Sequence, residues 1–149
     1  MGTKTVIDTN VFISAFGWKG NPIEIIRLVE QGDITLLLSI QQLQEINRVL
    51  RYPRIHFSEQ QIKERMQLIF DIAQIVDIKG NLNVIKEDPS DNIILETAIE
   101  HNAEYVITGD KHLLKLKQYK NVKIVTPKEF LLKTGRMSQD REGHTAWIW

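Results

Sequence analysis

Three short apolar runs in this sequence each lead into a turn that carries an acidic residue. The acids at these turns are Asp8, Asp88 with Asp91, and Asp110. In an open α/β sheet, strand ends that are far apart in the sequence meet in one crevice, where ligands bind. The pattern therefore predicts a parallel α/β sheet that gathers carboxylates at one edge, and gathered carboxylates favour a divalent metal ion.

The length of 149 residues is sufficient for one folded domain that buries roughly two-thirds of the surface of its unfolded form. Cysteine is absent from the sequence, which excludes a disulfide framework, a thiolate zinc site and a cysteine nucleophile. The 19 Lys and Arg residues balance the 19 Asp and Glu residues, so overall charge does not attract a polyanion. Any contact with nucleic acid must therefore come from local patches.

The N-terminal residues lead directly into a strand-like run and lack the long apolar segment of a signal peptide or membrane anchor. The lack of cysteine is compatible with a reducing compartment. We therefore expect a cytoplasmic protein with no membrane role.

Apolar periodicity and turn residues predict strands that alternate with helices along the chain. The expected strands are 4–8, 34–38, 75–78, 105–108 and 122–125. The expected helices are 10–16, 22–30, 40–50, one beginning after Ser58, one opened by 88–91, and one at 128–132. This alternation predicts the α/β class, with a central, mostly parallel sheet flanked by helices. We expect residues 1–133 to form the domain and residues 134–149 a tail that is flexible or docks on a partner.

The acids at the turns also have a purely structural explanation, because Asp is a preferred residue at the N-cap of a helix. For any one acid taken alone, capping is the simpler interpretation. Several acids at one sheet edge make the capping interpretation weaker, because neighbouring carboxylates repel one another unless a cation neutralises them. The acids together therefore favour a metal site.

Glu45 does not fit the capping explanation, because it lies inside a predicted helix at the border of the apolar face. From this position its carboxylate can lean over the edge of the sheet. The alternative is a solvated side chain paired with Arg48, a contact worth about a few tenths of a kcal/mol. Glu45 on its own would favour that alternative, whereas with the other acids it completes an ordered set.

Four segments of the chain resemble, in order, the motifs of the PIN-domain nuclease family. The segments are VIDTNVFISA at 6–15, LQEINRVL at 43–50, DPSDN at 88–92 with LETA at 95–98, and YVITGDKHLL at 105–114. Each motif alone is weakly specific, but four in this order and spacing, within residues 4–132, are strongly so. The chain most resembles the prokaryotic branch of toxins from toxin-antitoxin pairs, which implies a three-layer PIN-like fold.

The resemblance implies an acidic quartet that is catalytic and binds the metal, together with supporting residues. The quartet is Asp8, Glu45, Asp91 and Asp110. The supporting residues are Asn10, Thr108 and Asp88. No acid of the quartet departs from the family pattern.

Carboxylate oxygens suit Mg²⁺ or Mn²⁺, and one or two such ions would activate a water for attack on a phosphodiester. The expected function is metal-dependent endoribonuclease activity. The resemblance further implies that the substrate is RNA, that the protein is the toxin of a toxin-antitoxin pair with an antitoxin partner, and that it forms a homodimer.

Basic residues that follow the acids are candidates for binding RNA phosphates. They are Arg48 and Arg51 after Glu45, and Lys111 and His112 after Asp110. Affinity from such contacts would fall as the salt concentration rises. A solvated charged surface is the alternative explanation for them, and a lone histidine is often structural.

Other functions fit parts of the pattern. A non-catalytic PIN-like scaffold would keep the acids and bind RNA without turnover. A phosphatase with Asp8 as covalent nucleophile usually has a second acid two positions later, where this chain has Asn10. A phospho-receiver needs paired acids after the first strand, where Asp8 stands alone.

Overall fold

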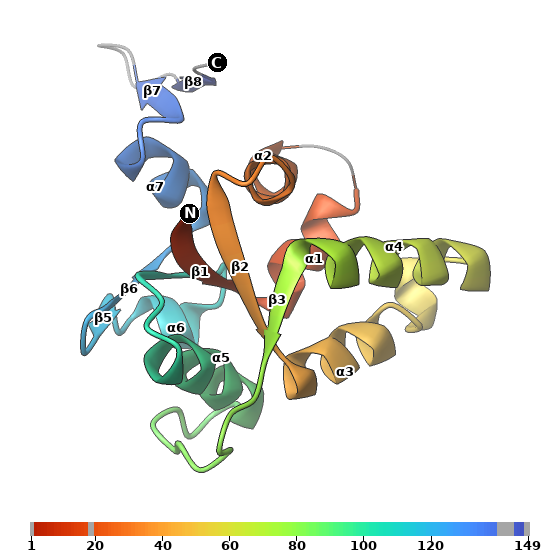
Figure 1. The fold of residues 1–149 in the computed structure, drawn as a ribbon, viewed down its shortest axis with the longest axis horizontal. Helices are drawn as coiled ribbons and strands as arrows, with labels where there is room; N and C mark the ends of the chain where they lie inside the picture. Colours follow the sequence, from red (N-terminus) through yellow and green to blue (C-terminus); the bar gives the residue numbers. More distant parts are fainter. Residues whose placement is uncertain (1, 18–19, 140–144, 148–149) are drawn as a thin grey trace.

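The centre of the fold is a sheet in which strands far apart in the sequence lie side by side (Figure 1). The computed structural model describes residues 2–17, 20–139 and 145–147. The strands of this sheet are β1 (Thr3–Ile7), β2 (Ile34–Ser39), β3 (Ala73–Val76), β4 (Tyr105–Ile107), β5 (Gln118–Tyr119) and β6 (Val122–Val125). Their order is β3-β2-β1-β4-β6-β5, and every pairing is parallel except that of β5 with β6.

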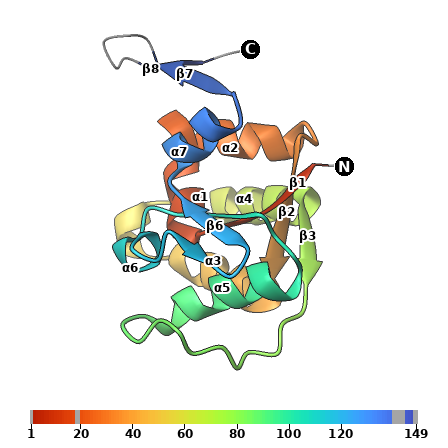
Figure 2. The ribbon, with the colours of Figure 1, turned by 90° about the vertical axis from the view of Figure 1, so that its left-hand side faces the viewer.

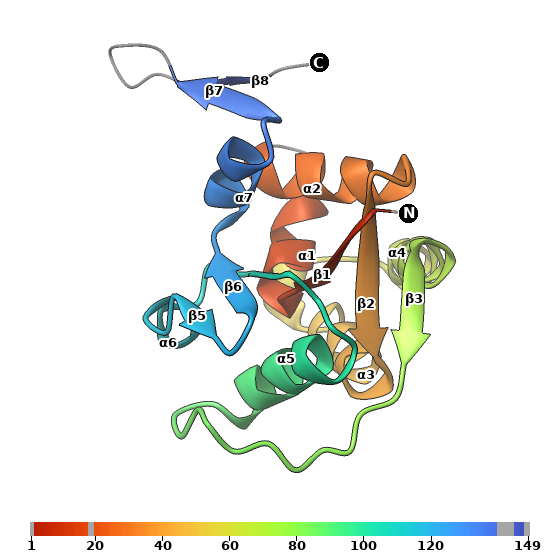
Figure 3. The same cartoon turned by 60° about the vertical axis from the view of Figure 1, so that its left-hand side comes forward.

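Helices cover both faces of the sheet and give the fold three layers (Figures 1 and 3). The helices are α1 (Thr9–Ala15), α2 (Gly20–Glu30), α3 (Ile40–Val49), α4 (Glu59–Ile72), α5 (Pro89–Glu100), α6 (Lys111–Leu114) and α7 (Pro127–Lys133), with a short 3₁₀ helix, η1 (Pro53–Ile55). One core contains residues of α1, α2, α3, α4 and α7, and the other contains residues of α5 and α6. The predicted α/β class with a mostly parallel sheet is confirmed.

Apolar side chains point to both faces of the sheet, which explains why helices pack on both of them. In β1, Val6 belongs to the core under α5, while Ile7 belongs to the core under α1 and α2. In β4, Val106 likewise belongs to the core under α5, and Ile107 belongs to the core under α1 and α2. Successive side chains of a strand point to opposite faces, so a strand that is apolar at every position must be buried on both sides.

The predicted strand at 75–78 lies two residues earlier, at Ala73–Val76. The parallel register sets its bounds, because Leu36 pairs with Ala73 and Ser39 pairs with Val76. Because β2 ends at Ser39, the partner of Val76, residues 77 and 78 have no strand beside them to pair with. The short elements α6, β5 and η1 were not predicted, because two to four residues carry too little periodicity.

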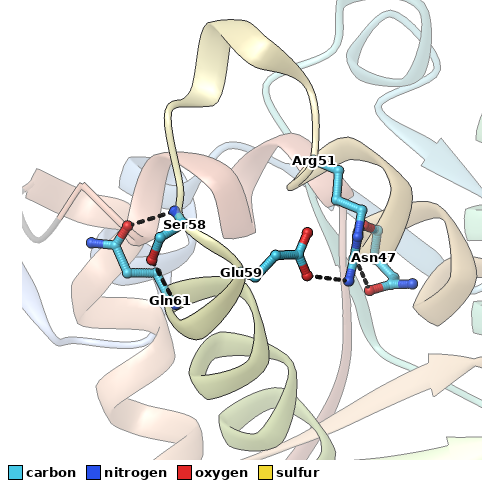
Figure 4. A network of polar contacts seen from close by, with 5 residues as sticks. All are labelled: Asn47, Arg51, Ser58, Glu59 and Gln61. Atoms are coloured by element: carbon cyan, nitrogen blue, oxygen red, sulfur yellow. Dashed lines mark hydrogen bonds and ion pairs between the residues drawn. The ribbon is translucent and has the colours of Figure 1, made fainter.

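Ser58 caps α4 as expected, and the contact is visible in Figure 4. Its hydroxyl accepts a hydrogen bond from the backbone N–H of Gln61 at 3.1 Å. In return, the side chain of Gln61 accepts from the backbone N–H of Ser58 at 2.9 Å. This reciprocal pair satisfies two of the N–H groups that a helix start leaves without partners.

Beyond α7, two short strands pair antiparallel with each other and lie away from the main sheet (Figure 2). They are β7 (Met137–Gln139) and β8 (Thr145–Trp147). Gly135 adopts a φ of 74° where α7 ends, a left-handed conformation that glycine favours. Of the expected tail, residues 140–144 and 148–149 lie outside the described residues.

Candidate metal centre

Two neighbouring strands bring Asp8 and Thr108 to the same edge of the sheet. β1 and β4 pair in parallel register with Ile7 beside Ile107, so the two strands end at the same level. Asp8 follows β1 directly, and its backbone N–H donates to the carbonyl oxygen of Ile107 at 2.9 Å. The register therefore joins residues that are 100 positions apart in the sequence.

The Thr108 hydroxyl connects the acids that follow these strands. It donates to Oδ2 of Asp8 at 2.7 Å and accepts from the backbone N–H of Asp110 at 2.9 Å. Thr108 and Asp8 are buried, with 0% and 7% of their surfaces exposed. A hydroxyl engaged as both donor and acceptor is fixed in rotation, so Thr108 holds the Asp8 carboxylate in one orientation.

The start of α5 adds two further carboxylates. Asp88 accepts hydrogen bonds through Oδ1 from the backbone N–H and the hydroxyl of Ser90, at 3.0 and 2.7 Å. Asp91 is 3% exposed, and its Oδ2 has no hydrogen-bond partner among the described residues. Carboxylate oxygens of Asp88, Asp91 and Asp110 lie within 4.8 Å of one another, close enough to ligate one metal ion.

N-capping accounts for two of the acids but not for the other two. Asp88 caps α5, and Asp110 caps α6 by accepting from the backbone N–H of His112 at 2.7 Å. The side chain of Asp8 makes no capping hydrogen bond to α1, and Asp91 lies within the first turn of α5. N-capping by a side-chain hydrogen bond therefore does not explain Asp8 or Asp91.

Glu45 approaches the same edge from α3. The last residue of β2, Ser39, caps α3 by accepting from the backbone N–H of Gln42 at 3.0 Å, so the helix starts where the strand ends. The carboxylate of Glu45 accepts a hydrogen bond from the hydroxyl of Thr9, the residue after Asp8. The structure thus places Glu45 at the sheet edge, and its chemical role stays a prediction.

Burial and neighbouring negative charges both disfavour the ionised form of Asp91. Burial is the larger cause, and together they raise the pKa of Asp91 to about 7. The contributing charges, in decreasing order of effect, belong to Asp110, Asp88, Asp8 and Glu45. Burial is also the largest cause of a raised pKa at Asp8. The ion pairs found among the described residues include none of these five acids.

This set of donors fits a divalent cation. All of the candidate ligands are oxygen atoms, which suits hard ions such as Mg²⁺ and Mn²⁺. Oδ2 of Asp91 is a buried acceptor with no hydrogen-bond donor in the part of the chain that the structure describes, and a cation would satisfy it. A bound cation would also favour ionisation of carboxyls whose pKa is raised in its absence.

Asn92, the residue after Asp91, holds the segment that leads to Asp88. Residues 77–88 have no helix or strand and run alongside α5 (Figure 3). The side chain of Asn92 accepts from the backbone N–H of Ile85 at 2.7 Å and donates to its carbonyl oxygen at 2.8 Å. Because Ile85 stands three residues before Asp88, this pair of contacts fixes the approach of the chain to the candidate metal centre.

Glu96 lies one turn after Asn92 and holds an earlier part of the same segment. Its carboxylate is 4% exposed and accepts from the backbone N–H groups of Gly80, Asn81 and Leu82. Sequence reasoning missed both residues. The available signal was two polar residues spaced i, i+4 on a helix whose other positions are mostly apolar.

Replacing Glu96 by Ala is expected to destabilise the protein by about 2 to 4 kcal/mol, because three backbone N–H groups lose a charged acceptor. Urea unfolding measures the change. Glu64→Ala is the matched control, since Glu64 is exposed on α4 and accepts a hydrogen bond from the side chain of Gln60 at 3.0 Å, so its loss should cost less than about 1 kcal/mol. Equal losses in the two variants would contradict the role given to Glu96.

The predicted RNA-binding residues divide between two places. A pocket of about 530 Å³ adjoins the acids and is lined in part by Asn10, Ser14, Asp110, Lys111 and His112; we call it the Ser14 pocket. Arg51 instead pairs with Glu59 at 3.2 Å and bonds to Asn47, at a groove between α3 and α4 (Figure 4). Arg48 is exposed in the last turn of α3.

A profile of the PIN domain matches residues 4–112, which include all of the acids described above. The chain belongs to the PIN domain family. PIN domains are generally nucleases that use divalent metals, so the family assigns the chain to the hydrolases and agrees with a metal at these acids. Among the described residues of this PIN domain protein, no helix is both long and apolar enough to cross a membrane.

Two further comparisons show proteins to which the chain is similar. The uncharacterized protein MJ1680 of Methanocaldococcus jannaschii is 33% identical over 140 residues, covering 86% of this chain and 89% of that protein. A crystal structure of VapBC2 from Rickettsia felis, bound to a DNA fragment from the promoter, is similar with a TM-score of 0.58. That match covers 82% of this chain and 97% of the other at 15% identity, so it shows a shared fold.

Proposed function

We propose that this PIN domain protein is a metal-dependent endoribonuclease that hydrolyses phosphodiester bonds of RNA. The observation that carries the proposal is the convergence of carboxylate oxygens from Asp88, Asp91 and Asp110 within 4.8 Å. The buried Asp8 joins them through Thr108, whose hydroxyl contacts both Asp8 and the backbone of Asp110. Such an arrangement of hard oxygen donors is suited to metal-assisted hydrolysis.

The proposal gives each acid a role. Asp8, Asp91 and Asp110 hold one or two Mg²⁺ or Mn²⁺ ions, and Asp88 completes the group. When bound, the metal lowers the pKa of a water and stabilises the leaving oxygen of the phosphodiester. Glu45 serves as a ligand, or orients the attacking water and takes its proton.

Thr108 and Asn10 support these acids in the proposal. Thr108 keeps the carboxylate of Asp8 in place through the 2.7 Å hydrogen bond. Asn10 is exposed in the first turn of α1, next to the acids, where its amide can contact the substrate. Neither residue has to change its protonation state.

We further propose that the protein is the toxin of a toxin-antitoxin pair in the cytoplasm. The resemblance of its motifs to the toxin branch of the family supports this, and so does a fold shared with VapBC2. The proposal includes an antitoxin protein that binds and silences the nuclease, and a homodimer as the assembly of this chain.

Cleavage of end-labelled RNA with Mg²⁺ or Mn²⁺, compared with the same reaction in EDTA, tests the nuclease proposal. We expect cleavage that depends on the metal and returns when the metal is restored. RNA that is bound but left intact with both metals would instead favour a non-catalytic scaffold. A phosphoryl group trapped on Asp8 would favour a phosphatase.

A further inference from the structure

We propose that the Ser14 pocket binds the nucleoside that adjoins the scissile phosphate, with its base seated between α1 and the start of α7. This inference rests on the nuclease function proposed above and adds to it a place where the enzyme holds RNA through a base. The pocket is built by the β4–α6 turn and by α1, α2 and α7, so segments from across the chain converge on it.

The pocket and the metal centre share a wall. Asp110 lines the pocket and also supplies one of the three oxygens that lie within 4.8 Å of one another. The 2.7 Å hydrogen bond from the backbone N–H of His112 to Asp110 fixes the first turn of α6 against this wall. A phosphodiester at the metal therefore has one of its two nucleosides at the mouth of the pocket.

The size and lining of the pocket suit a nucleoside. Its volume of about 530 Å³ lies in the range of roughly 300 to 1,000 Å³ that is typical of small-molecule sites. Pro22 and Pro127 offer apolar ring faces to a base or a ribose. Asn10 and Ser14 lie one helical turn apart on α1, are both exposed, and supply hydrogen-bond donors and acceptors for the edge of a base.

Charge sets the direction in which the nucleotide lies. The carboxylates would repel a phosphate from most of this region, and the exposed Lys111 is the cation beside Asp110 in the pocket lining. The phosphate is therefore expected between the metal and Lys111, and the uncharged base points away from the acids toward Ser14. This geometry separates recognition of the base from chemistry at the phosphate.

The groove between α3 and α4 provides the comparison. It has a similar volume of about 540 Å³ and is lined in part by Leu43, Arg51, Lys63 and Phe70. None of the five acids of the metal centre lines it. A large side chain placed in this groove is therefore a matched control for one placed in the Ser14 pocket.

The first test uses the four ribonucleosides, without phosphate and without metal, as probes of the intact protein. Titration followed by amide NMR shifts should perturb Asn10, Ser14 and Gly109, with at least one base binding in the millimolar range. The uncharged probes avoid repulsion by the acids. Shifts that are absent, or that are confined to the α3–α4 groove, would overturn the proposal.

The second test fills the pocket. Ser14→Trp should raise KM for RNA about tenfold or more and change kcat less than about threefold, because a filled pocket removes binding and leaves the acids in place. Lys63→Trp should leave both constants unchanged. Gly109→Leu is a second variant that fills the pocket, and we expect it to raise KM as Ser14→Trp does. A side chain fits at this position, since a Cβ at Gly109 would meet no atom within 4 Å.

The outcomes separate the two proposals. Cleavage that is equally sensitive, or equally insensitive, to Ser14→Trp and Lys63→Trp would overturn the nucleoside site and leave the nuclease function standing. Nucleoside binding at Asn10 and Ser14 by a protein that cuts no RNA would overturn the nuclease function and, with it, the position of this site beside a scissile phosphate.

Discussion

Asp8→Asn is expected to lower the rate of metal-dependent RNA cleavage by about 1,000-fold or more, corresponding to about 4 kcal/mol of activation free energy. The variant keeps the size of the side chain and an oxygen that can accept the hydrogen bond from Thr108. It removes the negative charge that a metal ligand must supply at this buried position. Initial rates on labelled RNA, at a saturating concentration of Mn²⁺, measure the change.

The control for this variant is Asp71→Asn. Asp71 is an exposed acid of α4 whose side chain accepts a hydrogen bond from Gln67 at 2.8 Å, outside the metal centre. Its replacement should leave the cleavage rate within about twofold of the wild type. If the Asp8 variant cleaved RNA at a rate near that of the control, Asp8 would have no role in the reaction.

Asp91→Asn is expected to stabilise the metal-free protein at pH 8 by about 2 to 4 kcal/mol, raising Tm by about 5 to 10 °C. In the folded protein the pKa of Asp91 is about 7, against an ordinary value of 3.8. At a pH between these two pKa values, Asp91 keeps its proton in the folded state and has lost it in the unfolded state. The stability of the wild type therefore falls as the pH rises from about 4 to about 7, and the Asn variant lacks this loss.

The pH dependence distinguishes this effect from a change in packing. The gain in Tm should be small at pH 4 and should reach its full size above about pH 7. Mn²⁺ at pH 8 should stabilise the wild type more than the variant, because the ionised Asp91 is a ligand only in the wild type. A variant that is less stable than the wild type at every pH would contradict the charge repulsion assigned to this site.

Local sequence patterns were enough to place Asp8 and Asp110, because each acid directly follows a strand or its turn and the strands are apolar at successive positions. Parallel pairing then aligned the ends of β1 and β4, as the alternation of strands and helices predicts. The position of Glu45 followed from helical periodicity, and its contact with Thr9 agrees with it. These features depend on short-range order and on one simple topology.

The rest of the site depends on contacts that periodicity does not reveal. Asp88 was predicted in a supporting role, and one of its carboxylate oxygens lies in the same group as those of Asp91 and Asp110. Its orientation depends on Ser90 and on the path of residues 77–88, which Asn92 and Glu96 hold in place. An irregular segment has no repeat from which its course can be predicted, so only the three-dimensional structure shows these contacts.

Direct binding of Mn²⁺, followed by the loss of the electron paramagnetic resonance signal of the free ion, tests most directly whether these acids form a metal centre. We expect that the wild type binds one or two ions and that Asp110→Asn weakens the affinity at least about tenfold, because Asp110 belongs to the convergent group of oxygens. Absence of binding by the wild type, or equal binding by the two proteins, would contradict this expectation.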